Sequence, residues 1–138
     1  MDMPIPLRVR LAALWATLMS LYIYNDYFML YRPGVLGAMA QGKMGPLGPA
    51  TPTVLIAVSA MLAIPALMIA LSVLLPSVAS RWLSAAIAIF YTGIEGLTLV
   101  GADPAYQIVV ALEIVTTLAI LAIAVRWPVP RFPGGSEP

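Results

Sequence analysis

Three carboxylic acids of the sequence, Asp26, Glu95 and Glu113, lie inside long apolar runs. An ionisable side chain costs several kcal/mol when such a run enters a lipid bilayer, so acids at these positions indicate a functional site. A carboxyl there persists either in its neutral form or as an anion that faces a cation. The chemistry open to the three acids is therefore the binding of a cation or the transfer of a proton.

Polar and aromatic residues accompany the acids at helical spacing. Tyr22 precedes Asp26 by four positions and Asn25 by three, and Tyr91 precedes Glu95 by four. Residues so spaced share one face of a helix. Threonines follow the third acid at the same spacing. The candidate ligand-binding residues are Asp26, Glu95, Glu113, Tyr22, Asn25, Tyr91 and Thr117. The competing structural interpretation is that neutral acids hydrogen-bond to these hydroxyl groups and fix the helices together.

The composition places these acids in a membrane protein. Of 138 residues, 62% are hydrophobic and 9% are charged, whereas about a quarter of the residues of a soluble domain are charged. The same apolar content excludes intrinsic disorder. The formal net charge of +1 offers no basic surface for nucleic acid, which is therefore excluded as a partner.

Cysteine and histidine are both absent. Their absence excludes disulfides, thiol nucleophiles, Ser-His-Asp triads and histidine-ligated haem or zinc. Gly42 and Gly45 lie in a Pro-rich connection without the strand–turn–helix context of a phosphate-binding loop. The sequence predicts no metal site and no cofactor, although carboxylates and carbonyls can hold a hard cation. Whether the protein is an enzyme is left open.

Four apolar runs are long enough to cross about 30 Å of hydrocarbon as helices. They cover residues 11–30, 53–75, 82–100 and 105–127. The first run has full length and carries Asn25 and Asp26, so we expect a span and not a cleaved signal peptide. The predicted fold is all-α: a polytopic membrane protein with a four-transmembrane-helix bundle over residues 1–127. Residues 128–138 are predicted to form a disordered tail.

Basic residues fix the predicted orientation. An even number of spans places both termini and the second connection on one side. That side holds Arg8, Arg10, Arg81, Arg126 and Arg131, and the other side holds Arg32 and Lys43. Because short cytoplasmic segments are enriched in Lys and Arg, both termini are predicted to be cytoplasmic.

The orientation brings the three acids to similar depths. From the outer ends of their runs, Asp26 lies about 6 Å deep, Glu95 about 7 to 8 Å and Glu113 about 12 Å. All three fall in the outer half of the membrane, which predicts that acids distant in sequence lie together. In the second run, Pro65 frees a backbone carbonyl near mid-membrane and should kink the helix.

The long outer connection, residues 31–52, is rich in Gly and Pro, which prevents a long helix. Residues 35–40 could form a short helix at the outer interface. A connection of this length serves either as a functional lid or as a passive strap, and the sequence does not choose between them.

The chain resembles an uncharacterised bacterial family of small four-span membrane proteins that is known as a domain of unknown function. The resembling segments, spread over about residues 10–127, are Leu14-Trp15, Tyr22–Asp26, Ile64–Met68, Arg81-Trp82 and Glu113–Leu118. The chain departs from the family pattern at Asn25, where a small residue is usual, and at Leu83-Ser84, where an Asn is usual. The resemblance implies a four-helix fold in the bacterial cytoplasmic (inner) membrane with Asp26 and Glu113 among the signature residues. It implies no activity.

Three function hypotheses follow. The first is a small-molecule or cation binding or transport protein with an acidic–aromatic pocket in the outer half of the bundle, which would need a homodimer for transport. The second is an integral membrane enzyme with paired carboxyls that acts on a lipid-soluble, sterol- or isoprenoid-like substrate. The third is a non-catalytic subunit or assembly partner of a larger membrane complex. The sequence favours the first.

Overall fold

The structure, a computed structural model, describes residues 3–128. In this part of the chain the elements are helices and no strand occurs, which confirms the predicted all-α class. The elements are α1 (Leu7–Met29), α2 (Val35–Ala40), the short 3-10 helix η1 (Gly45–Leu47), α3 (Pro52–Leu74), α4 (Ser77–Leu99) and α5 (Pro104–Arg126). The predicted disordered tail lies, apart from Pro128, outside the described residues.

Four helices of 23 residues each form the body of the molecule. Three of them, α3, α4 and α5, are long and apolar enough to cross a membrane. The first helix has the length but lacks the apolarity, because Arg8, Arg10, Asn25 and Asp26 lie within its bounds. The predicted count of four spans is therefore not exact by this measure. Helices α1 and α4 also begin earlier than predicted, at Leu7 and Ser77.

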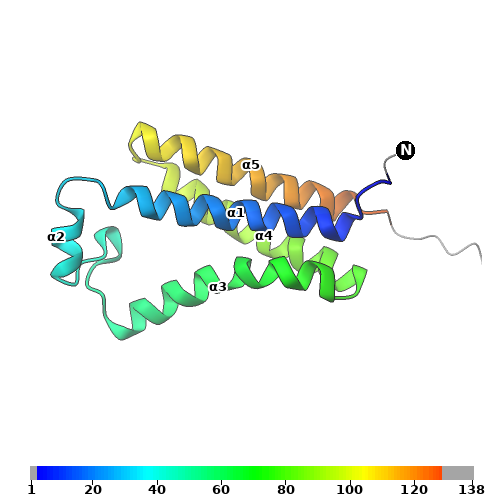
Figure 1. Cartoon of the computed structure of the whole chain (residues 1–138), viewed down its shortest axis with the longest axis horizontal. Helices are drawn as coiled ribbons and strands as arrows, with labels where there is room; N and C mark the ends of the chain where they lie inside the picture. Colours follow the sequence, from blue (N-terminus) through cyan, green and yellow to red (C-terminus); the bar gives the residue numbers. More distant parts are fainter. Residues whose placement is uncertain (1–2, 129–138) are drawn as a thin grey trace, which may run out of the picture.

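The four long helices lie side by side and alternate in direction (Figure 1). Helix α4 packs most extensively on α5, and α1 packs on both α3 and α5. Helix α2 and η1 lie at one end of the bundle, and the start of α1 and the end of α5 lie at the other. These ends are called outer and inner below, after the predicted orientation.

The packed core lies in the part of the bundle nearer the inner end. Leu11, Trp15 and Leu18 are fully buried and recur at spacings of four and three, which places them on one face of α1. They pack against Met68 of α3 and against Ala88 and Ile120, from α4 and α5. The indole nitrogen of Trp15 donates a hydrogen bond of 3.3 Å to the Oγ atom of Ser84.

Arginines tie the helix ends together at the inner end. The Arg8 side chain donates to Ser77 Oγ at 2.7 Å, which joins the first turn of α1 to that of α4. Arg81 donates to the carbonyls of Ala124 at 2.8 Å and Val125 at 3.1 Å. Carbonyls in the last turn of a helix have no intrahelical donor, so Arg81 supplies partners that α5 lacks. Arg8 and Arg81, which contribute to the predicted orientation, therefore also hold the helix ends together.

The outer connection contains the short helix that the sequence allows at residues 35–40. Gly34 begins it with a φ of +82°, a left-handed conformation that favours glycine. An ion pair between Arg32 and Asp103 joins this connection to the turn between α4 and α5. Asp103 also accepts a hydrogen bond from the Tyr106 amide and so caps α5.

Pro65 and Tyr91 form a structural pair in the middle of the bundle. Proline has no amide hydrogen, so the carbonyl of Met61, four residues earlier, loses its helical donor. The Tyr91 hydroxyl of α4 donates to this carbonyl. Helix α3 changes direction near its middle, as predicted, and its part before Pro65 diverges from α1 toward the outer end (Figure 1).

We expect Tyr91→Phe to lower the free energy of unfolding by about 1 kcal/mol, because the Met61 carbonyl then lacks a donor in a site without water. In a Pro65→Ala background the alanine amide can serve this carbonyl, so the same substitution should cost measurably less. A double-mutant cycle, measured by SDS titration in mixed micelles, gives the coupling. Equal costs in both backgrounds would contradict the pairing.

Candidate functional site

Glu95 lies on the buried face of α4 and is 3% exposed. Both of its carboxyl oxygens have hydrogen-bond partners. The Tyr22 hydroxyl of α1 lies 2.5 Å from Oε1, and the Thr117 hydroxyl of α5 lies 2.9 Å from Oε2. Thr117 is in turn 2.8 Å from the hydroxyl of Thr92, one turn before Glu95. The Glu95 carboxyl thus joins three helices and is fully satisfied by side chains.

Glu113 is as deeply buried as Glu95, with 4% of its surface exposed. Its Oε1 atom is buried and has no hydrogen-bond partner among the described residues. Thr117, one turn further along α5, donates to Glu95 instead. Two neighbouring carboxyls therefore have opposite environments: one has two hydroxyl partners, and the other carries an unsatisfied polar atom.

Asp26 completes a group of three carboxyls, called the acid cluster below and consisting of Asp26, Glu95 and Glu113. The charges of Asp26 and Glu95 both lie close enough to Glu113 to interact with it electrostatically. Asp26 is the exposed member of the cluster, whereas the other two are buried. The three acids come from α1, α4 and α5, and each lies in the outer half of its helix, as the depth argument predicts.

No basic side chain of the described residues forms an ion pair with the acid cluster. Arg32, which follows the outer end of α1, pairs with Asp103 in the outer turn. If the acids of the cluster are ionised, their countercharge must come from outside the described residues. If the acids are neutral, bound protons take the place of that countercharge.

The two predicted tyrosines have different functions in the structure. Tyr22 is half-buried and binds the carboxyl of Glu95. Tyr91 is buried and binds the Met61 carbonyl, although it shares the face of Glu95 as the spacing predicts. Tyr22 therefore belongs to the acid cluster's immediate surroundings, and Tyr91 supports the helix that faces it.

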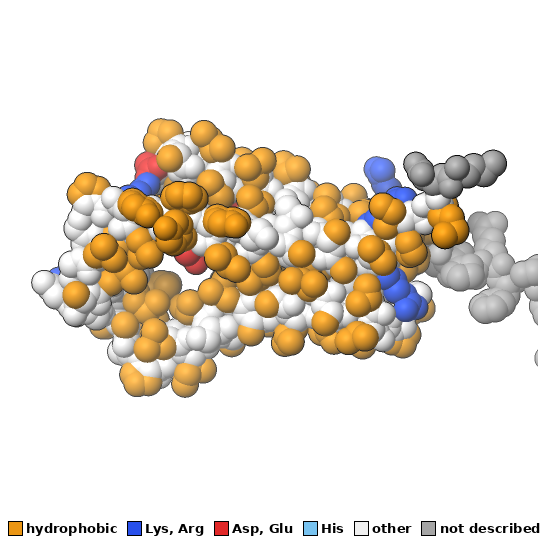
Figure 2. Space-filling view, in the orientation of Figure 1, with side chains coloured by type: hydrophobic (Ala, Val, Ile, Leu, Met, Phe, Trp, Pro, Cys, Tyr) orange, Lys and Arg blue, Asp and Glu red, His pale blue; other side chains and the backbone are white. Residues whose placement is uncertain are grey.

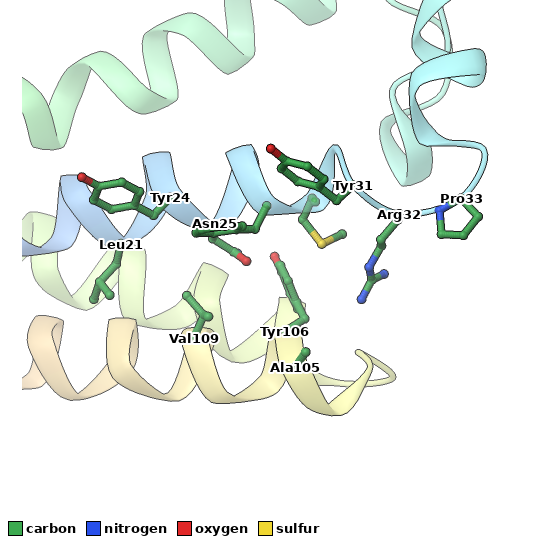
Figure 3. A pocket seen from close by; sticks show the side chains of 11 residues that line it. Leu21, Tyr24, Asn25, Tyr31, Arg32, Pro33, Ala105, Tyr106 and Val109 are labelled. Carbon is green, nitrogen blue, oxygen red and sulfur yellow. The ribbon is translucent and has the colours of Figure 1, made fainter.

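Asn25 lies in a different place from the acids. It lines a cavity of about 530 Å³ between the outer parts of α1 and α5, and none of the three cluster carboxyls lines that cavity. Asn25 and Tyr106 extend toward one another across it (Figure 3). Successive residues of a helix point about 100° apart, which separates Asn25 from Asp26 despite their adjacency. The ligand-binding role of Asn25 stays a prediction for this separate cavity.

The side of the bundle between α1 and the outer part of α3 is hollowed (Figure 2). An acidic side chain lies at the margin of this hollow, and apolar side chains surround it. The residues of α3 before Pro65 are exposed or half-buried. The buried residues of this helix are Pro65, Met68 and Ser72. The outer half of the molecule is therefore open where the inner half is packed.

Thr92, whose hydroxyl contacts the hydroxyl of Thr117, was not identified in the sequence analysis. It lies three residues before Glu95, at the same helical spacing that identified the other candidates. Its side chain is within 2.7 Å of the Ala88 carbonyl and also reaches Thr117. Helical spacing could have identified it as a neighbour of Glu95, but not its contact with α5.

The pattern of one protein family matches residues 7–131 of the chain; it is described as a family of unknown function (DUF6326). This match covers both the acid cluster and the cavity at Asn25. No curated protein and no solved structure matches the chain.

The two glutamates should respond differently to removal of their carboxyls. Glu95→Met leaves the Tyr22 and Thr117 hydroxyls without their acceptor, so we expect the free energy of unfolding to fall by about 1 to 3 kcal/mol. Glu113→Met removes an unsatisfied atom, so stability should stay unchanged or rise by up to about 1 kcal/mol. SDS titration of both purified variants compares them, and an equal loss of stability would contradict the difference in environment.

Proposed function

The chain belongs to the family of unknown function DUF6326, and from that premise we propose that it binds a cation at the acid cluster as a small-molecule binding or transport protein. The observation that carries this proposal is the Glu113 carboxyl, which is buried and has an oxygen without a partner among the described residues. An unsatisfied buried carboxyl costs stability, and natural proteins retain such costs mainly at functional sites.

The surroundings favour a positively charged ligand. Two further carboxyls lie near Glu113, and no described Lys or Arg pairs with them. Three acids that repel one another in a medium of low dielectric constant bind a cation or a proton most strongly. The Tyr22 ring beside Glu95 adds an aromatic face, and carboxylates with aromatic rings suit an organic ammonium or phosphonium ion.

The purely structural interpretation explains Glu95 well but not Glu113. Glu95 joins α1, α4 and α5 through its two hydroxyl partners, as a structural acid would. Glu113 makes no such connection at Oε1, so a structural role does not account for its burial. Hydrogen bonds within membranes contribute only about 0.6 kcal/mol on average, which is a weak reason to keep an acid there.

Acid–base catalysis on a lipid-soluble substrate is the second candidate. The observation in its favour is that two adjacent carboxyls, Glu95 and Glu113, have contrasting environments, as the acid and the base of an enzyme do. Chemical conversion of an isoprenoid or sterol by the purified protein, lost in both glutamine variants, would favour the enzyme over the binding protein.

The proposed location is the bacterial cytoplasmic membrane, with both termini inside. The apolar surfaces of α3, α4 and α5 require lipid, and the distribution of arginines supplies the orientation. Transport through four helices would further require a second copy of the chain, which we propose as a homodimer.

We expect Glu113→Gln to abolish the binding of tetraphenylphosphonium, a lipophilic organic cation, by the protein in bilayer nanodiscs. Glutamine keeps the shape of the side chain and removes its charge. Asp103→Asn is the matched control, because it removes the same charge while asparagine still caps α5. Scintillation proximity with labelled tetraphenylphosphonium measures both variants. Binding by Glu113→Gln with wild-type affinity would refute the proposal.

The proposed orientation predicts which introduced thiols react from outside the cell. The chain has no cysteine, so each variant carries a single thiol. Met39→Cys on α2 should react with a membrane-impermeant maleimide on intact cells, whereas Val78→Cys near the inner end should react only after lysis; both positions are exposed. The reverse pattern would place the termini outside.

A further inference from the structure

We propose that the acid cluster is entered sideways from the outer leaflet of the bilayer, through the opening between α1 and the outer arm of α3 (residues 52–64), so that its ligand is a lipophilic organic cation and not a hydrated inorganic ion. This inference rests on the proposed cation-binding function and names both the route and the ligand class. Four observations carry it.

The first observation is the opening itself. The molecule is hollowed between α1 and the outer arm, and an acidic side chain lies at the margin of the hollow (Figure 2). Asp26 is the exposed acid of the cluster and interacts electrostatically with the buried Glu113. The proposed path therefore leads from an exposed carboxyl, that of Asp26, to the buried carboxyl of Glu113.

The second observation is the incomplete packing of the outer arm. Six residues of α3, at spacings of three and four, form one face toward the bundle: Val54, Val58, Met61, Pro65, Met68 and Ser72. The last three are buried, and the first three are only half-buried. The face that closes the inner half of the bundle thus continues into the outer half, where it lacks a complete set of partners.

The third observation is that the outer arm can diverge without leaving a polar group unsatisfied. Pro65 interrupts the helical hydrogen bonds, and the Tyr91 hydroxyl serves the Met61 carbonyl that this leaves free. In lipid, where each unsatisfied backbone group is costly, such a partner is needed for a stable bend. The bend and the opening therefore belong to the native fold.

The fourth observation concerns the walls of the opening. The outer arm carries no charged residue, and the residues of its face toward the bundle, Val54, Val58 and Met61, are apolar. A hydrated inorganic ion would lose its water against such a wall without compensation, whereas an organic cation would gain apolar contacts. From the aqueous side, α2 and η1 lie across the outer end of α1 and α3 (Figure 1). The lateral route is thus open in the space-filling view, and the outer arm beside it carries no charged residue (Figure 2).

The experiment compares two cations and two tryptophan variants in bilayer nanodiscs. Wild-type protein should bind tetraphenylphosphonium at least about 100-fold more tightly than tetramethylammonium, because only the former buries a large apolar surface. Val58→Trp adds bulk on the face toward the bundle and should slow association and dissociation of tetraphenylphosphonium together by about tenfold, with little change in Kd. Ile56→Trp is the matched control: it lies two residues away and is 70% exposed, so both rates should stay at wild-type values.

Scintillation proximity with immobilised nanodiscs gives both rates and both affinities. If tetramethylammonium binds as tightly as tetraphenylphosphonium, or if a folded Val58→Trp variant shows wild-type rates, lateral entry is overturned while cation binding stands. Should wild-type protein bind neither cation, the proposed function itself fails and the inference fails with it. Val54→Trp, on the same face, replaces Val58→Trp with the same expectations if the latter does not purify as a folded protein.

Discussion

Hydrocarbon supplies no hydrogen-bond partners, and the rest of the structure depends on this constraint. Every polar group that the helices carry into the membrane must be satisfied within the bundle. Ser80 donates to the Ser72 carbonyl at 2.9 Å, and Trp15 donates to Ser84, so the buried polar atoms of α1, α3 and α4 are paired across helices. Where proline removes a helical donor, the Tyr91 hydroxyl replaces it. Glu113 Oε1 departs from this rule among the buried side-chain atoms of residues 3–128.

The inner and the outer half of the bundle meet this constraint in different ways. The inner half is closed by large apolar side chains around Trp15 and by arginines that tie the helix ends. The outer half is open at the arm of α3 and holds all three intramembrane carboxyls. A packed inner half allows the outer half to keep an unsatisfied polar atom, because the contacts of the core offset the cost.

The positions of the helices and the similar depths of the three acids could be predicted from the sequence, because both depend only on position along the chain. Run length and hydropathy locate the helices, and depth along a span places Asp26, Glu95 and Glu113 at similar levels. The partner of each polar group depends instead on rotation about the helix axes, which depth does not determine. Asn25 therefore lines a cavity that its neighbour Asp26 does not line, and Arg32 pairs with Asp103 and not with the cluster. The apolarity of α1 is lowered at both of its ends, by Arg8 and Arg10 at the inner end and by Asn25 and Asp26 at the outer end.

The asymmetry between Glu95 and Glu113 links the fold to the proposed chemistry. The Glu95 carboxyl is held in one position by hydroxyl groups from two other helices. A second carboxyl beside it lacks such donors and is repelled by the first, so it gains most from a proton or an incoming cation. In the proposed function, the Glu113 carboxyl is therefore the position at which the cation binds. A hydroxyl partner for Glu113 would make the bundle more stable but would occupy the position that the proposed cation takes. The missing partner at Oε1 is therefore the feature on which the proposed site depends.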